Sequence, residues 1–391
     1  MEKQINAEII DRPSDSNAIL NEFIPIWPQG TGKTFNASFP PISKVNNLDK
    51  DSIISLTLPK TIYGMVGYET RIYFNNLVIC YNKSLLKFSV QCDIGCYNNS
   101  YWSVTPNTPG DYPLTINVKD ANNRTIGTAE TIVKVANPQN GNDQNIVVLI
   151  IGDSIMGNAK IADFLQENII KNGNKNIRFM GSHSGGGAPL AINKAAVEAY
   201  GGWQWETFMT RYLEGDEYNK KTKFMKMENG QLIDGIQDYL DKYNAGLAPD
   251  IVIFALGCND IACANMSNIN SEIEKSVANR TKLLSMCRKA MPNSLFGITL
   301  LAPPNCREEA FEINYKGSIQ RHQYLYNQLS YVKRTLEDFQ DDDNYSIIPI
   351  YAGVDELADY PNDNAVHPNE IGQRRFALML EMWLKNLNYN A

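Results

Sequence analysis

An α/β fold is predicted for residues 145–391, where short apolar runs alternate with longer stretches of helical periodicity. This alternation indicates strands connected by helices, and five such strands predict a parallel sheet between two helical layers. Residues 51–136 instead alternate with period two and are dense in β-branched and aromatic residues, which predicts a small antiparallel sandwich. The sequence therefore predicts a three-layer α/β/α domain preceded by an all-β accessory domain.

The predicted elements follow from the position of each run. The five strands are expected at Ile146–Ile151, Ile177–Met180, Ile251–Leu256, Leu295–Leu301 and Ser346–Ile350. The helices are expected at Ala159–Lys171, Gln231–Tyr243, Ile273–Ala290, Tyr315–Phe339 and Asn369–Leu387. A polar linker, residues 137–144, separates the two domains, and residues 1–50, rich in Pro, Asn and Ser, are expected to form an extended arm. The stretch Gly110–Val118 resembles the late strands of immunoglobulin-like accessory domains.

Composition excludes several classes of function. The formal net charge of -7 argues against a nucleic-acid partner. The odd number of cysteines, seven, favours buried free thiols over a disulfide framework. The three histidines are not spaced with cysteines as a metal site requires, so no metal is expected. The first residues lack the apolar core of a secretory signal, and no apolar run is long enough to span a membrane.

Two polar motifs directly follow predicted strands. Gly152-Asp153-Ser154 follows Ile146–Ile151, and a serine at this point lies where open α/β sheets place their ligands, although the same tripeptide also occurs as a helix cap. Asn259 follows Ile251–Leu256, and its amide can donate to a developing oxyanion, although an Asx-turn is the alternative interpretation.

Two further motifs lie in predicted loops. His367 lies beside a proline and is closely preceded by a carboxylate, which favours a general base. The Gly201-Gly202 step can turn backbone N–H groups toward a ligand, and the alternative is a turn with two core tryptophans, Trp203 and Trp205.

The order of Ser154, Gly202, Asn259 and His367 resembles the SGNH (GDSL-type) hydrolase family. The resemblance covers about 245 residues and implies a flavodoxin-like sheet and no cofactor. It implies that Ser154 attacks an ester carbonyl and that His367 takes and returns the serine proton. The backbone N–H groups of Ser154 and Gly202 and the side chain of Asn259 would form the oxyanion hole.

The last motif departs from the family pattern. The family usually has an aspartate three residues before the histidine, where this chain has Asn364, and Asp363 lies four before. Either Asp363 reaches Nδ1 of His367, which the sequence favours slightly, or a Ser-His dyad works with Asn364 or a backbone carbonyl as a neutral partner.

The substrate prediction rests on a smaller block. Glu198–Trp203 resembles the Glu-Gly-x-x-Gly-Trp block of SGNH carbohydrate esterases, with Ala199 in place of the first glycine. An O-acetylated polysaccharide is therefore the expected substrate, with Trp203 and Trp205 stacking on sugar rings unless they pack in the core. Asp153 and Asn364 are further expected substrate contacts.

Two other hypotheses stay open at the level of sequence. One hypothesis is that the chain is a structural or host-binding component of a bacteriophage tail that carries this esterase domain. Residues 1–50 and the β domain would then assemble it as a homo-oligomer or into the virion. It can also hydrolyse lipid esters, although no strongly apolar lid is visible. The expected location is correspondingly a virion or the cell exterior, and otherwise the cytoplasm.

Overall fold

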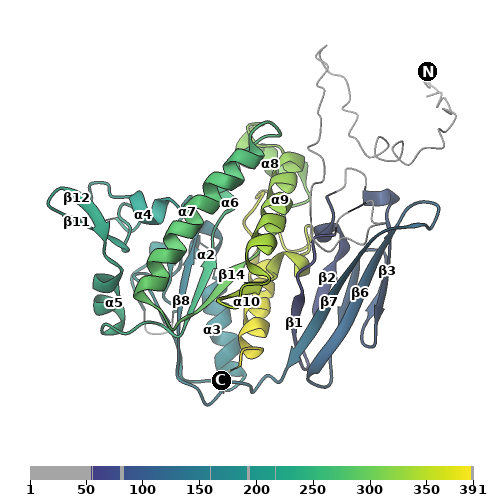
Figure 1. Ribbon diagram of the computed structural model, residues 1–391, viewed down its shortest axis with the longest axis horizontal. Helices are drawn as coiled ribbons and strands as arrows, with labels where there is room; N and C mark the ends of the chain where they lie inside the picture. The colour runs from purple at the N-terminus through teal and green to yellow at the C-terminus, as the bar shows by residue number, and fades with distance from the viewer. Residues whose placement is uncertain are drawn as a thin grey trace, which may run out of the picture.

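The computed structural model describes residues 54, 56–79, 83–158, 160–191, 194–215 and 217–388. The predicted arm, residues 1–50, lies outside the described residues. Within them, an all-β unit lies beside a larger α/β part (Figure 1). Among the described residues, no helix combines the length and apolar character that crossing a membrane requires.

The β unit, residues 61–136, contains two sheets. The first has the order β1 (Thr61–Met65), β7 (Thr125–Ala136), β6 (Gly110–Lys119) and β3 (Lys87–Cys92). The second has the order β2 (Thr70–Tyr73), β5 (Tyr101–Val104) and β4 (Cys96–Tyr97). The expectation of a purely antiparallel sandwich is wrong in one respect, because β1 runs parallel to β7. A parallel pair requires a long connection, and all the other strands of the unit lie between these two in the chain. The immunoglobulin-like assignment stays a prediction.

The α/β part is built on a parallel sheet with the order β10-β8-β13-β14-β15, in which β9 also pairs with β8. The five predicted strands are present as β8 (Ile146–Gly152), β9 (Ile177–Met180), β13 (Ile251–Ala255), β14 (Leu295–Thr299) and β15 (Tyr345–Ile348). A sixth strand, β10 (Glu198–Ala199), pairs with the carboxyl end of β8, while β9 pairs with its amino end. Three adjacent strands therefore end together at Gly152, Ala199 and Ala255.

Helices cover both faces of this sheet, and β8 shows why. Ile146, Val148 and Ile150 pack in a core with α3 (Ile161–Lys171) and α10 (Glu370–Lys385). Leu149 and Ile151 pack on the opposite face with α5 (Ile236–Asn244) and α7 (Ile269–Ala290). A strand buried on both faces is apolar throughout, so the continuous apolar sequence of β8 predicts a buried strand.

Two predicted helices differ from the structure. Residues Gln231–Asp234 form strand β12, which pairs with β11 (Met225–Glu228), so the helix expected from Gln231 begins at Ile236. The helix expected over Tyr315–Phe339 begins only at Arg321, as α9 (Arg321–Phe339), and Tyr315 is the last residue of a separate helix, α8 (Glu308–Tyr315). Lys316 and Gly317 separate them with φ of 49° and 79°, a left-handed conformation that ends a helix.

The described cysteines are free thiols. The expectation that they are buried holds for Cys258 and Cys287, whereas Cys96 and Cys263 are exposed. Cys80 lies outside the described residues.

Candidate active site

Ser154 and His367 form a hydrogen-bonded pair at the carboxyl edge of the sheet. Ser154 is the first residue of α2 (Ser154–Asn158), directly after β8, and His367 precedes α10. Nε2 of His367 lies 2.8 Å from Oγ of Ser154. Burial lowers the pKa of His367 below its ordinary value, so the ring is neutral at neutral pH and Nε2 can accept the serine proton.

The other ring nitrogen of His367 faces Asn364, not Asp363. Oδ1 of Asn364 lies 3.1 Å from Nδ1 and accepts a hydrogen bond from the backbone N–H of His367 at 2.9 Å. An amide oxygen at Nδ1 requires the proton on that nitrogen, which leaves Nε2 free to face Ser154. The preference for Asp363 as the partner of His367 is therefore wrong. The side chain of Asp363 is exposed, and its backbone oxygen accepts from Nδ2 of Asn314.

Two asparagines that the sequence did not single out hold this loop. Nδ2 of Asn305 donates to the backbone oxygens of Pro361 and Asn364, at 2.7 and 2.9 Å. Asn314 accepts from the backbone N–H of Ala365 at 2.7 Å. These bonds fix the turn in which Asn364 can reach a ring three residues ahead. Asparagines in loops are common, so no sequence signal distinguishes these two.

Two hydrogen bonds connect Asn259 to the loop of residues 200–206, which contains Gly202 and is called the Gly202 loop. Asn259 lies in α6 (Cys258–Ile261), and its Nδ2 donates to the backbone oxygen of Trp203 at 3.0 Å. Gln204 Nε2 donates in return to the backbone oxygen of Asn259 at 2.9 Å. One proton of the Asn259 amide is thus used in the loop, and the amide carries a second one for a ligand.

Gly202 adopts a conformation that favours glycine. Its φ is +76°, and a Cβ added there would meet no heavy atom within 4 Å. The loop is anchored to the nucleophile strand because Tyr200 N donates to Gly152 O at 3.0 Å. The structure therefore brings together the segments that carry Ser154, Gly202, Asn259 and His367.

Asp153 was expected to contact the substrate, but it is a buried structural residue. It is 2% exposed, and its carboxylate accepts from the backbone N–H of Ile155 and from Sγ of Cys258, both at 2.9 Å. Burial raises the pKa of Asp153 to about 6 and raises that of the Cys258 thiol well above its ordinary value. These contacts shape the turn that presents Ser154.

Trp203 and Trp205 also belong to the core. Each is 1% exposed, so neither presents a ring face to a sugar, and the stacking prediction is wrong. Trp203 stacks on Tyr200 with ring centroids 3.9 Å apart, and Trp205 Nε1 donates to the hydroxyl of Tyr331 at 2.9 Å. Indole rings packed in this way hold the backbone of the Gly202 loop.

A buried polar network that the sequence did not predict lies under the same loop. Glu198 is 1% exposed, accepts from the hydroxyl of Tyr200 and from the backbone N–H of Ser182, both at 2.5 Å, and has its pKa raised by burial. His183 is also buried and lies 3.0 Å from the backbone oxygen of Ala199 through Nε2. Sequence patterns do not reveal burial of these residues, because Glu is mostly exposed in proteins and His is only intermediate in burial.

A serine hydrogen-bonded to a histidine at the carboxyl edge of a parallel sheet is typical of the class of serine hydrolases. The model of the GDSL-like lipase/acylhydrolase family matches residues 148–380, more than half of the chain, and the chain belongs to this family. It is therefore an enzyme of the kind that hydrolyses ester bonds. No group of three or more His, Cys, Asp or Glu side chains in the described part of the chain is arranged to hold a metal ion.

Several solved structures are similar to part of this chain. A carbohydrate esterase family 3 protein from Talaromyces cellulolyticus is 19% identical, covering 61% of this chain and 96% of its own, with a TM-score of 0.40. A family 3 carbohydrate esterase of Clostridium thermocellum is 16% identical, covering 60% and 92%, with a TM-score of 0.38. The lipase Lip_vut3 from a goat rumen metagenome is 14% identical, covering 60% and 95%, with a TM-score of 0.38.

Because these names include both esterases and a lipase, they do not select a substrate. A comparison with curated proteins finds no match. None of the matches supports the hypothesis of a virion component.

Proposed function

We propose that the chain removes O-acetyl groups from carbohydrate by acyl-enzyme chemistry at Ser154. The observation that carries the chemistry is the 2.8 Å contact between Ser154 Oγ and His367 Nε2. A nucleophile within hydrogen-bond reach of a neutral base, which a third group orients, is the arrangement that activates a serine. The carbohydrate substrate rests on the block Glu198–Trp203.

In the proposed reaction, Ser154 Oγ attacks the ester carbonyl while His367 Nε2 takes its proton. The backbone N–H groups of Ser154 and Gly202 and the amide of Asn259 donate to the oxyanion. The tetrahedral intermediate collapses, and His367 returns the proton to the leaving alcohol. Water then attacks the acyl-serine with His367 as the base, which releases acetate and restores Ser154.

Asn364 supports His367 with a neutral oxygen. It fixes the tautomer and the ring orientation as an aspartate would, but it stabilises the imidazolium less, because it carries no negative charge. The proposed enzyme is therefore a Ser-His-Asn hydrolase with a weakly activated serine.

The test is acetate release from a panel of acetylated glycans, with lipid esters as the second arm. Acetylated glycans should release acetate, and Ser154→Ala should lower the rate by about a thousandfold or more. Circular dichroism of the variant checks that it is folded. Acetate release by Ser154→Ala at the wild-type rate contradicts the chemistry, and hydrolysis of lipid esters alone contradicts the substrate.

A further inference from the structure

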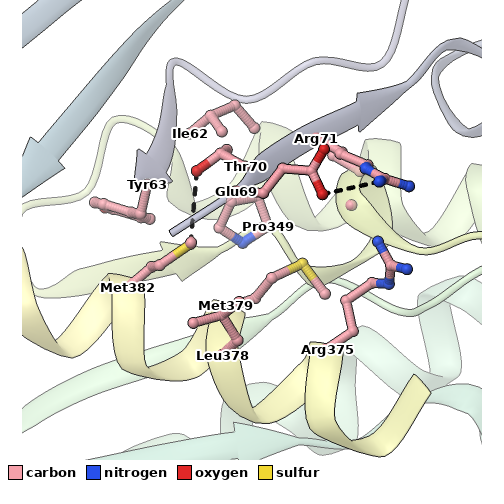
Figure 2. A pocket seen from close by; sticks show the side chains of 12 residues that line it. Ile62, Tyr63, Glu69, Thr70, Arg71, Pro349, Arg375, Leu378, Met379 and Met382 are labelled. Carbon is pink, nitrogen blue, oxygen red and sulfur yellow. Dashed lines mark hydrogen bonds and ion pairs between the residues drawn. The ribbon is translucent and has the colours of Figure 1, made fainter. Parts of the chain in front are cut away.

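The β unit meets the α/β part along a seam between β1, β2 and α10. Side chains of Ile62 and Thr70 lie opposite Met379 and Met382 (Figure 2), and Thr70 Oγ1 is 3.7 Å from the Met382 sulfur. The seam encloses a cavity of only about 40 Å3. Ligand pockets usually have about 300 Å3 or more. The seam is therefore a packed contact and not a substrate site.

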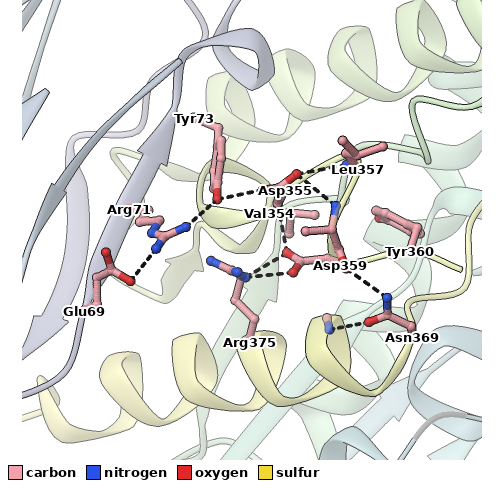
Figure 3. Close-up of polar contacts among 12 residues, drawn as sticks. Glu69, Arg71, Tyr73, Val354, Asp355, Leu357, Asp359, Tyr360, Asn369 and Arg375 are labelled. Carbon is pink, nitrogen blue, oxygen red and sulfur yellow. Dashed lines mark hydrogen bonds and ion pairs between the residues drawn. The ribbon is translucent and has the colours of Figure 1, made fainter. Parts of the chain in front are cut away.

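At one end of this seam, a buried tyrosine links the two parts. The hydroxyl of Tyr73, in β2, accepts from Nη1 of Arg71 at 3.0 Å and donates to Oδ2 of Asp355 at 3.1 Å (Figure 3). Nη2 of Arg71 is in turn paired with Glu69 at 2.8 Å. Tyr73 is 8% exposed and Asp355 is half-buried, so the bond between them is partly shielded from water.

Asp355 opens the segment that carries His367. Its Oδ1 accepts from the backbone N–H groups of Leu357 and Ala358, both at 3.0 Å, and its own N–H donates to Oδ2 of Asp359 at 2.8 Å. Asp359 is completely buried and paired with Nε of Arg375, from α10, at 2.8 Å. Residues 355–359 therefore form a rigid turn fixed from both sides.

The other end of the segment returns to this turn. Asn369, the N-cap of α10, donates its backbone N–H to Asp359 O and its Nδ2 to Ala358 O, each at 2.9 Å. Figure 3 shows Asn369 beside the turn that carries Asp355 and Asp359. His367 is two residues before Asn369, so the turn is the base of the loop that holds His367 2.8 Å from Ser154 Oγ.

We infer that Tyr73 of the β unit is a positioning residue for His367, acting through Asp355 and the turn 355–359. A shift of the turn moves Asn369, and with it the ring that lies 2.8 Å from Ser154 Oγ. Proton transfer depends steeply on this geometry. The inference rests on the proposed role of His367 as the base.

The experiment compares two substitutions that each remove one hydroxyl, Tyr73→Phe and Tyr68→Phe. Tyr68 lies in the same unit and donates to Oδ1 of Asn172 at 2.7 Å, at the far end of α3. On an activated acetyl ester, Tyr73→Phe should lower kcat by about fivefold to tenfold with KM unchanged. Tyr68→Phe should keep the wild-type kcat. Equal kcat values in the two variants would overturn the inference.

Hydrogen exchange gives a readout that does not need activity. Backbone amides of residues 355–369 should exchange faster in Tyr73→Phe than in Tyr68→Phe, while those of α3 should not. Equal protection of residues 355–369 in both variants overturns the inference. An inactive wild-type chain would instead contradict the proposed function, and the exchange comparison would still decide the role of Tyr73.

Discussion

At the scale of single residues, the partner of His367 determines how strongly Ser154 is activated. Asn364 supplies a neutral oxygen at 3.1 Å from Nδ1, and burial lowers the pKa of His367, which this uncharged oxygen does not oppose as a carboxylate would. A base of lowered pKa stays unprotonated to a lower pH but takes the serine proton less readily. His367 is therefore a weaker base, but it stays unprotonated, and the enzyme stays active, in mildly acidic solution.

Asn364→Asp should reverse this balance. A carboxylate at Nδ1 stabilises the imidazolium and raises the pKa of His367, so the acid limb of kcat/KM should move up by about one unit or more. Above that limb the rate should increase, since one unit corresponds to ~1.4 kcal/mol. Asp363→Asn, on the exposed neighbour, should leave the profile unchanged. A profile that stays in place in Asn364→Asp would show that Asn364 does not control the base.

Asp153 makes stability depend on pH. Burial raises its pKa to about 6 from 3.8, so the folded chain holds this proton more tightly than the unfolded chain. The stabilisation is complete below pH 4 and is lost as pH rises through 6. Asp153→Asn does not titrate, so its free energy of unfolding relative to wild type should rise by ~1–3 kcal/mol between pH 4 and 7.5. Urea unfolding at both values measures this, and a difference that is independent of pH would contradict the assignment.

At the scale of elements, the sequence predicts the long buried strands, but it does not predict the short strands whose position depends on turns. The five apolar strands were found because strands covered on both faces are apolar throughout. Strand β12 was predicted as the start of a helix because its four residues directly precede α5, although Asn229-Gly230 before it is a strong hairpin signal. Strand β10 was missed because it has two residues, one of them a buried glutamate.

The candidate site shows the same limit. The four segments that carry Ser154, Gly202, Asn259 and His367 were expected to form one site because their order resembles that of the SGNH family. The choice between Asp363 and Asn364 depends on a turn held by Asn305 and Asn314, which no local pattern encodes. Burial of Trp203 likewise depends on packing from distant helices.

Gly202→Ala tests the loop that contributes to the proposed oxyanion hole. Gly202 has φ of +76° with open space around its missing side chain, and Gly230, in the β11–β12 hairpin, has +78° with the same open space. Alanine should cost about 1–2 kcal/mol of stability at either position. Only Gly202→Ala should also lower kcat, by about a hundredfold, because its N–H moves from the oxyanion. Equal kcat in the two variants would contradict the proposed role of the Gly202 N–H in the oxyanion hole.

At the scale of the whole molecule, the β unit and the α/β part share a core. Ile116 and Val133 of the β unit belong to the same buried cluster as Val332 of α9 and Tyr351 of η4 (Ile350–Gly353). Figure 1 shows the unit alongside α10, and Asn386 Nδ2 donates to Gly64 O at 2.9 Å across the same contact. Tethered accessory domains have smaller and more polar interfaces, so this continuity predicts that the two parts unfold together.

Asn76→Ala tests this cooperativity. Asn76 is 2% exposed, and its Nδ2 donates to the backbone oxygens of Tyr351 and Val354 at 2.7 and 2.8 Å. Its loss leaves two buried acceptors unpaired, which costs about 2–3 kcal/mol. Calorimetry of the full chain should show one transition whose midpoint falls as a whole, because separating the parts exposes the shared core. Two transitions, of which Asn76→Ala shifts only one, would mean that the parts fold independently, and the β unit would then be an attachment instead of a support for the His367 segment.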